Sequence, residues 1–444
     1  MTRERAILAV LDAAKGTRIG HYFRLFSSSL KWSREEVERY RLLKLKRLLE
    51  TAEKNCPYYR GLFKAAGFEP AKVKRIADIE NIPILDRDTI RDRGHMLINE
   101  GIPNRKLFKG SSSGTTGTPI TYYHNRDGMS AGIAAGYVLW VMSGWRLGQR
   151  NVHVWGNATS IKRWNTWGSR MKNAIIRQRN IASTGLDDPE LADAAAREII
   201  AFDPVSIEGY PGAIFSLAQH FKAKGYSLQN LRQVLTTAEN LEDRQRELIE
   251  EVFSPTGDLY GSGEVLGVAA RPVADDKYYV FEPHVIVEAV ASGMAGMKDV
   301  VVTDLDNHGT PFIRYRIGDM IDSLNMPDDN SPYPFASFNK VMGRKSDVIL
   351  LPNGKRFHPV NIFGGTLFRR FPAISRHKVI WNGVSLKFVF ERNGPLDEEK
   401  LNAELQESLA SYDVPFTIEY TSRLAVPPGG KHTYLEIEAK RTGN

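Results

Sequence analysis

A short polar loop holds a dense collection of groups that could bind an oxyanion. Residues 110–119 read GSSSGTTGTP, with three glycines and six hydroxyl side chains. The glycines let the backbone approach an anion closely, and the hydroxyls can donate hydrogen bonds to it. A Walker loop would need glycine at Thr115 and lysine at Thr116, so the pattern disfavours a P-loop kinase or ATPase. A flexible Ser/Gly linker is the alternative, but the loop is rich in threonine and the strand-forming run 120–123 follows it.

Five further motifs follow the loop, each rich in residues suited to nucleotide chemistry. In chain order they are 237–240 (TAEN), 258–264 (DLYGSGE), 312–319 (FIRYRIGD), 343–347 (GRKSD) and 428–431 (PGGK). Taken singly, Glu264, Asp319 and Lys431 are each as consistent with an ordinary loop or surface residue. Taken together and in this order, the loop and the motifs resemble those of the adenylate-forming superfamily of acyl-CoA synthetases, luciferases and peptide-synthetase adenylation domains.

The resemblance implies an ATP site and a role for each motif. Glu264 would help to hold Mg²⁺, Asp319 and Arg344 would bind the ribose, and Lys431 would reach the acyl and phosphate oxygens. The catalytic residues implied are Lys431, Glu264 and Thr115. The residues that would bind the nucleotide are Ser111, Ser112, Ser113, Gly114, Thr115, Thr116, Gly117, Thr118, Ala238, Glu239, Asn240, Tyr260, Gly261, Ser262, Asp319 and Arg344. The acid would lie beside the α-phosphate, near Tyr210, Gly212 and Thr237.

The reaction that this class performs requires cations and hydrogen-bond donors of this kind. Attack of a carboxylate on the α-phosphate of ATP brings two anions together and builds charge on phosphorus, so cations and preorganised donors are needed. An aspartate that accepts hydrogen bonds from two vicinal ribose hydroxyls uses the same bidentate geometry as dinucleotide sites. We therefore expect activation of a carboxylic acid as an acyl-adenylate, with release of pyrophosphate.

Two segments indicate a branch of the superfamily. Residues 52–60 (AEKNCPYYR), followed by Phe63 and Gly67, resemble a signature of phenylacetate-CoA ligases and the related CapK group. Residues 207–211 (IEGYP) are similar to CapK-like members, and the length of 444 residues matches this compact branch. The resemblance implies acyl transfer to coenzyme A. Transfer to an amine or a sugar hydroxyl is the alternative, and a non-catalytic scaffold is a further one.

The sequence departs from the family pattern in three places. Gly263 stands where the family has threonine or serine, which puts the efficiency of activation in question. Ser346 stands at the usual acidic hinge position, which puts the switching of the C-terminal domain in question. Residues 161–180 contain six basic residues, including Lys162, Arg163 and Arg170, no acidic ones and two tryptophans. We expect a solvated helix with Trp164 and Trp167 anchored in the core. The alternative is contact with an anionic acceptor, glycan or membrane surface.

Composition narrows the class further. The formal charge is +8 and the pI about 9.3, but the basic residues are scattered and no nucleic-acid-binding module is recognisable, so no nucleic-acid partner is expected. Cys56 is the sole cysteine, which excludes an intrachain disulfide and a cysteine-built zinc site.

Without a signal peptide or a membrane-length apolar run, we expect a cytoplasmic protein. The histidines lack metal-binding spacing and are expected to be structural; His308 and His358 lie in or near the motifs.

The element pattern predicts an α/β fold in two domains. Residues 33–55 predict an amphipathic helix with a serine cap. Strand-like and helical runs alternate from 151 to 253, and extended segments between 278 and 304 predict an antiparallel or mixed sheet. We expect an N-terminal domain of residues 1–343, which binds ATP and the acid, and a small, mobile α+β domain of residues 344–444 that carries Lys431. The identity of the acid and the oligomeric state, monomer or homodimer, stay open.

Overall fold

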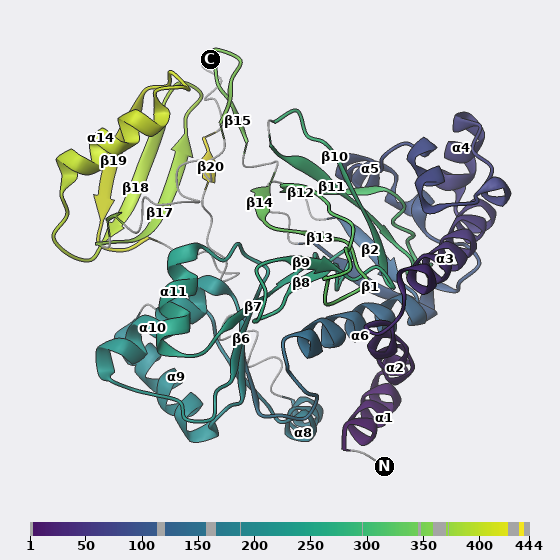
Figure 1. The fold of residues 1–444 in the computed structure, drawn as a ribbon, viewed down its shortest axis with the longest axis horizontal. Helices are drawn as coiled ribbons and strands as arrows, with labels where there is room; N and C mark the ends of the chain where they lie inside the picture. Colours follow the sequence, from purple (N-terminus) through teal and green to yellow (C-terminus); the bar gives the residue numbers. More distant parts are fainter. Residues whose placement is uncertain are drawn as a thin grey trace.

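The protein has a mixed α/β fold with a large N-terminal part and a smaller C-terminal part (Figure 1). The fold class expected from the sequence is therefore confirmed. The computed structural model describes residues 3–112, 120–156, 166–186, 188–294, 296–344, 348–357, 370–371, 373–424 and 435–438. Among these residues, no helix is both long and apolar enough to cross a membrane.

The largest sheet has eight strands in the order β13, β9, β8, β7, β6, β5, β3, β4. Its bounds are β3 Asn151–Val154, β4 Gln178–Ile181, β5 Ser206–Gly209, β6 Gln233–Thr237, β7 Thr256–Tyr260, β8 Ala269–Arg271, β9 Tyr278–Val280 and β13 Ser337–Phe338. The strands β7, β6, β5, β3 and β4 pair in parallel, whereas β8, β9 and β13 join antiparallel. The carboxyl ends of the parallel strands therefore share one edge, where open α/β sheets place their ligands.

Helices cover both faces of this sheet (Figure 1). On one face lie α9 Pro189–Phe202, α10 Pro211–Lys224 and α11 Asp243–Val252, which share a buried apolar core with Val234 and Ile207. On the other face, α6 Arg126–Met142 shares a core with Leu235 and with the first two helices of the chain. The adjacent residues Val234 and Leu235 point to opposite cores, as the two-residue period of a strand requires.

A second, antiparallel sheet lies beside the first. Its order is β10 Val285–Ala291, β11 Lys298–Asp304, β12 Tyr315–Ile321 and β14 Val341–Arg344, and a separate hairpin joins β1 Phe108–Ser111 to β2 Thr121–His124. The extended segments predicted between 278 and 304 are thus confirmed as strands. Their buried faces form one apolar core with helices from the first hundred residues.

The N-terminal helices wrap the side of the molecule shown in purple and blue (Figure 1). They are α1 Arg3–Lys15, α2 Ile19–Ser29, α3 Arg34–Asn55, α4 Pro57–Ala66 and α5 Arg87–Leu97, with short 3₁₀ turns η1 Pro70–Lys72, η2 Ile76–Asn81 and η3 Asn104–Lys106. The helix predicted over 33–55 is confirmed as α3. Ser33 caps it through a reciprocal capping box with Glu36.

The C-terminal part has its own sheet and its own apolar core, formed by residues between 349 and 435. Its elements are β15 Ile349–Leu350, β16 Arg356–Phe357, β17 Ile374–Trp381, β18 Leu386–Arg392, α14 Glu398–Leu409, β19 Phe416–Thr421 and β20 Leu435–Ile437. Two arginines join it to the N-terminal part: Arg244 donates to the carbonyl of Ile374, and Arg376 donates to Oγ of Ser216 at 3.0 Å. The exact domain boundary at 343/344 stays a prediction.

Candidate nucleotide site

The hairpin of β1 and β2 fixes the two ends of the polar loop. Ser111 pairs with Thr121, and the amide of Ser112 donates to the carbonyl of Ile120 at 3.1 Å. Ser111 is exposed and Ser112 half-buried. The hairpin thus brings together the residues on either side of segment 113–119. The rest of the predicted phosphate loop, residues 113–119, lies outside the described residues, and its role stays a prediction.

Arg87 links the loop to the motif that carries Glu264. Its Nη2 donates to Oγ of Ser112 at 2.5 Å, and its Nη1 donates to Oε1 of Glu264 at 3.1 Å. The side chain of Glu264 is 6% exposed, so a carboxylate there needs a cationic or hydrogen-bonding partner. Arg87 begins α5, directly after the N-cap position Asp86. The sequence-based prediction did not include it, because no motif marks a lone arginine at the start of a helix.

Gly263 lies against the hydroxyl of Tyr122. The Tyr122 hydroxyl donates to the carbonyl of Gly263 at 2.6 Å, and a Cβ atom at position 263 would lie 3.0 Å from that hydroxyl oxygen. Burial and the nearby Glu264 carboxylate raise the pKa of Tyr122 to about 12, so its hydroxyl stays protonated at neutral pH. The tyrosine therefore supplies a hydroxyl next to the position where the resemblance expects threonine or serine.

Tyr260 and Asp319 meet across the two sheets. The hydroxyl of Tyr260, at the end of β7, donates to Oδ2 of Asp319 on β12 at 3.0 Å. Arg344 is the register partner of Asp319 on the adjacent strand β14, although nothing is described of its side chain. Three residues that the resemblance assigns to adenine and ribose are thus brought together by the fold.

The turn after β7 carries the other two predicted residues of this motif. Ser262 closes it, since its amide donates to the carbonyl of Val265 at 2.9 Å and its Oγ accepts from the Val265 amide at 3.1 Å. A Cβ atom on Gly261 would lie 3.3 Å from the amide nitrogen of Gly267, so the backbone is closely packed there. The turn holds Tyr260 and Glu264 at its two ends.

The predicted acid-side residues, together with residues 238–240 that were assigned to the nucleotide, lie at the carboxyl ends of β5 and β6. Thr237 donates through Oγ1 to the carbonyl of Leu259 at 3.0 Å, and Ala238 has a φ of +69°. The amide of Gly212, in the first turn of α10, lies 3.4 Å from Oε2 of Glu239. Asn240 is exposed. These residues therefore share one sheet edge with Tyr260.

Tyr210 lies between an aromatic partner and a carboxylate at this edge. Its ring stacks on that of Trp155 with 4.2 Å between centroids. Burial and the charge of Glu239 raise the pKa of Tyr210. The buried, stacked ring forms an apolar wall beside Gly212.

Two residues before Tyr210, a buried acid faces a half-buried histidine. Glu208 is the register partner of His153, and its Oε1 lies 3.8 Å from Nε2 of that ring. Burial raises the pKa of Glu208 to about 8, against a smaller opposing effect of a hydrogen bond with Asn151. Burial, together with the charge of Lys172, lowers the pKa of His153 to about 4. Both side chains are therefore mainly neutral at pH 7. The sequence analysis did not predict these pKa shifts.

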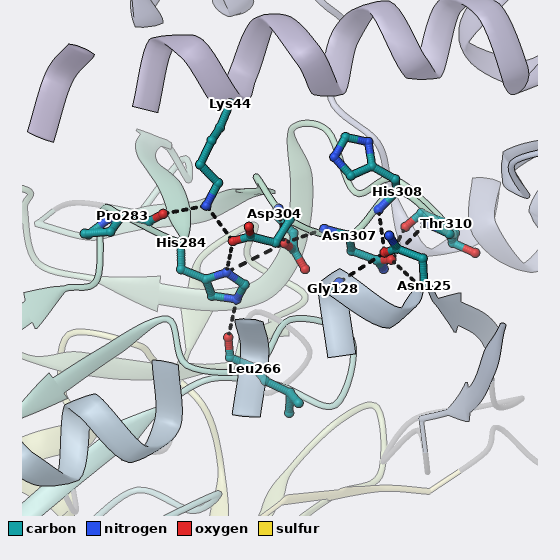
Figure 2. A network of polar contacts seen from close by, with 12 residues as sticks. Lys44, Asn125, Gly128, Leu266, Pro283, His284, Asp304, Asn307, His308 and Thr310 are labelled. Carbon is teal, nitrogen blue, oxygen red and sulfur yellow. Dashed lines mark hydrogen bonds and ion pairs between the residues drawn. The ribbon is translucent and has the colours of Figure 1, made fainter. Parts of the chain in front are cut away.

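A second polar network lies under α3, away from these motifs (Figure 2). His284, Asp304 and Asp306 are buried and close enough to hold a metal ion, but Nζ of Lys44 lies 2.6 Å from Oδ2 of Asp306. Both ring nitrogens of His284 have partners, Asp306 Oδ2 at 2.7 Å and the carbonyl of Leu266 at 3.0 Å. The lysine ammonium supplies the cation that this cluster needs, so we assign it a structural role.

A cavity of about 690 Å³ opens beside this network, between α2, α3 and residues 305–308. Two of its basic side chains are already in ion pairs, Arg18 with Asp127 at 3.2 Å and Lys44 with Asp306. His308 lines this cavity. None of the described residues that line the cavity belongs to the predicted nucleotide site.

One buried histidine is not fully hydrogen-bonded. His124 is buried and its Nδ1 has no hydrogen-bond partner among the described residues, so it is not a satisfied core histidine. Burial lowers the pKa of His124, which keeps the ring neutral. His358, Ser346 and the predicted catalytic Lys431 lie outside the described residues.

The sequence is similar to known proteins over most of its length. No protein-family model matches the chain. The chain is 24% identical to the protein CapK of Staphylococcus aureus over 399 residues, covering 86% of this chain and 85% of that protein. It is 22% identical to phenylacetate-coenzyme A ligase of Thermus thermophilus over 391 residues, covering 84% of this chain and 82% of that one.

Solved structures give the same fold. A 2-hydroxyisobutyryl-CoA ligase in the postadenylation state, in complex with R3-HIB-AMP, superposes with a TM-score of 0.73 at 16% identity, covering 92% of this chain and 91% of the other. The same ligase in the thioesterification state gives a TM-score of 0.58, with almost the same coverage.

The fold is thus that of the adenylate-forming CoA ligases among these solved structures. Over most of its length the chain is similar to the phenylacetate-CoA ligases and to CapK.

Proposed function

We propose that the protein activates a carboxylic acid with ATP as an acyl-adenylate and transfers the acyl group to coenzyme A. One observation supports this most strongly. Ser112 and Glu264 are joined through Arg87, while Tyr260, at the other end of the same turn, is joined to Asp319. Residues that are far apart in the sequence and suited to phosphate, magnesium and ribose are thereby linked through the turn that follows β7.

The first half-reaction follows from this arrangement. A carboxylate oxygen of the acid attacks the α-phosphorus of ATP, a new oxygen–phosphorus bond forms, and pyrophosphate leaves with the electrons of the broken bond. Negative charge develops on the oxygens of the α-phosphate, so fixed donors around it lower the barrier. Arg87 and Ser112 are such donors among the described residues, and Lys431 and the hydroxyls of the loop would add to them.

The residues present fit Mg²⁺ bound to the nucleotide. Mg²⁺ usually takes one or two carboxylates together with substrate phosphates and water. Glu264 offers a nearly buried carboxylate at the end of the turn that begins with Tyr260, and its Oε1 is fixed by Arg87. When bound, the ion would neutralise phosphate charge.

In the second half-reaction, the acyl group is transferred to the acceptor. The thiol of coenzyme A would attack the acyl carbon, forming a thioester and releasing AMP. The names of the phenylacetate-CoA ligases that the chain resembles support this acceptor. An amine or a sugar hydroxyl would attack the acyl carbon in the same way and form an amide or an ester. The similarity to CapK supports this alternative.

A catalytically silent scaffold is the rival proposal, with Gly263 as its main support. The hydroxyl of Tyr122, which donates to the carbonyl of Gly263, weakens that support because a hydroxyl is present there after all. The pairing of Glu264 with Arg87 also shows a carboxylate held in place.

The test is acid-dependent release of pyrophosphate from Mg-ATP, measured with a panel of aryl, fatty, hydroxy and amino acids. Wild type is compared with Lys431→Ala and with Asp319→Asn, each with and without coenzyme A. Release that needs an acid and falls by orders of magnitude in Lys431→Ala supports the proposal, and formation of an acyl-CoA identifies the acceptor. ATP binding without release for any acid in the panel would favour the scaffold.

A further inference from the structure

The helix α8, Trp167–Ile176, presents an unusual face to solvent. Trp167 is 77% exposed and Met171 is 49% exposed, and Arg170 and Ala174 are exposed beside them. These four residues have the spacing i, i+3, i+4 and i+7, so they lie along one stripe of the helix. The expectation that Trp167 is anchored in the core is wrong, whereas Trp164 lies outside the described residues.

An exposed tryptophan next to an exposed methionine marks a surface that contacts something. A single exposed apolar residue is ordinary, but adjacent large apolar side chains on one helix face indicate an interaction site. The buried side of α8 offers no reason to expose Trp167, because Ile176 is the residue that enters the core. The exposed stripe is therefore not the consequence of packing on the other face.

The charged residues within α8 and the strand that follows it are all basic. Between residues 166 and 186 the chain carries Arg170, Lys172, Arg177 and Arg179 and no acidic residue. Arg179 lies 3.5 Å from Glu198 of α9, an exposed pair that solvent screens. Arg170 therefore places a positive charge within the exposed stripe, and this charge favours contact with a negatively charged surface over a neutral one.

The neighbouring helix extends the same character. The first helix, α1, contacts α8 and lies at the same end of the molecule (Figure 1). Val10 of α1 is 44% exposed, and Ala9 and Ala13 next to it are exposed as well. Small apolar residues on α1 therefore accompany the larger ones on α8.

We propose that α8 docks the protein on the surface of an anionic lipid membrane. Trp167 and Met171 would enter the interface between headgroups and acyl chains, and Arg170 with its basic neighbours would contact lipid phosphates. Tryptophan prefers this depth of a bilayer, and basic residues near it are attracted to anionic lipids. An acidic glycan or nucleic acid would use the positive charges but would leave the exposed methionine without a role. The protein lies on the membrane, since α8 has 10 residues and does not span it.

Vesicle sedimentation with the full chain tests the proposal. The vesicles are pure phosphatidylcholine or phosphatidylcholine with 30% phosphatidylglycerol, each at low and high NaCl concentration. We expect binding to the anionic vesicles at low salt, at least tenfold weaker binding to the neutral ones, and a decrease at high salt. Tryptophan emission should shift to the blue on binding. The shift should be smaller in Trp167→Phe than in wild type, because that variant lacks the contribution of Trp167.

Paired variants separate the apolar stripe from a general effect of charge. Trp167→Ser with Met171→Ser, and separately Arg170→Glu, should each reduce vesicle binding at least tenfold, while thermal unfolding and pyrophosphate release in solution stay unchanged. Met326→Ser is the control, because Met326 is 61% exposed in the loop between β12 and β13. Unchanged vesicle binding in the Trp167/Met171 variant, or no binding to anionic vesicles by wild type, overturns the proposal. Retention on heparin that needs Arg170 but not Trp167, without vesicle binding, overturns it in favour of an acidic glycan.

Discussion

The hydroxyl of Tyr260 donates a hydrogen bond to Oδ2 of Asp319 over 3.0 Å, which joins the end of β7 to the second sheet. The two residues are separated by 59 positions in the chain. An aromatic ring and a carboxylate are thereby held side by side, next to the strand that carries Arg344. We propose this pair as the part of the site that contacts the nucleotide.

Asp319→Asn should weaken ATP binding about 10- to 100-fold. The substitution keeps the shape but removes the charge that strengthens hydrogen bonds from two ribose hydroxyls, a loss of about 1.5–3 kcal/mol. Tyr260→Phe keeps the ring and should cost less than about tenfold. Titration calorimetry with Mg-ATP measures both. Asp322→Asn, which alters an exposed contact of Asp322 with Asn339, serves as control, and wild-type affinity in Asp319→Asn would contradict the assignment.

Arg87→Ala should lower kcat/KM by at least tenfold and also lower the melting temperature. The change leaves the nearly buried Glu264 without its guanidinium partner, and Arg87 is itself 35% exposed, so we expect a destabilisation of about 1–3 kcal/mol. Arg91→Ala is a matched control on the same helix, because its contacts with Asp88 and Asp92 are exposed. Steady-state kinetics and thermal unfolding give the two values. Equal kcat/KM in Arg87→Ala and wild type would remove Arg87 from the site.

Gly263→Ala should destabilise the protein by about 1–3 kcal/mol, because the new methyl group meets the Tyr122 hydroxyl at 3.0 Å. Combining it with Tyr122→Phe removes the oxygen that it meets, so the double variant should lose less than the sum of the two single variants. Urea unfolding of all four proteins measures this coupling. Strict additivity would show that the close approach has no energetic effect.

Glu208→Gln should stabilise the protein at alkaline pH. The folded-state pKa of Glu208 is raised to about 8, so between about pH 4.5 and 8 the folded protein holds a proton that the unfolded chain has lost. Its stability therefore falls by up to about 1.4 kcal/mol per pH unit in that window, and the full contribution is present only below it. Glutamine keeps the shape and does not titrate.

Melting temperatures of wild type and Glu208→Gln from pH 5 to pH 9 measure the effect. The two curves should diverge as the pH rises, with the variant the more stable at pH 9. Parallel curves would show that Glu208 ionises as an ordinary exposed acid. Glu251→Gln is the control, since Glu251 is exposed and pairs with Lys222.

Local sequence signals predicted the elements well. The capping box at Ser33 and the leucines after it fixed the start and the buried face of α3. The alternation of strand-like and helical runs gave the parallel strands β3, β5 and β6 and the helices around them, since each element buries an apolar stripe of its own period. Trp167 was placed wrongly because periodicity tells which residues share a face but not whether that face meets another element.

The grouping of site residues could be predicted only as far as motifs extend. Tyr260, Glu264 and Asp319 were assigned from short patterns, and the structure brings them to one edge. Arg87 and Tyr122 escaped prediction, because their importance arises from contacts across 177 and 141 positions of the chain. The raised pKa of Glu208 escaped it for a similar reason, since burial is a property of the packed sheet.

Isotope transfer from the acid to AMP tests the central claim most directly. An acid found active in the panel is labelled with ¹⁸O in both carboxyl oxygens and incubated with Mg-ATP, coenzyme A and the protein. Attack of the carboxylate on the α-phosphorus predicts AMP that carries one ¹⁸O atom, detected by mass spectrometry, and unlabelled pyrophosphate. Label in inorganic phosphate with formation of ADP, or AMP without label, would contradict the formation of an acyl-adenylate.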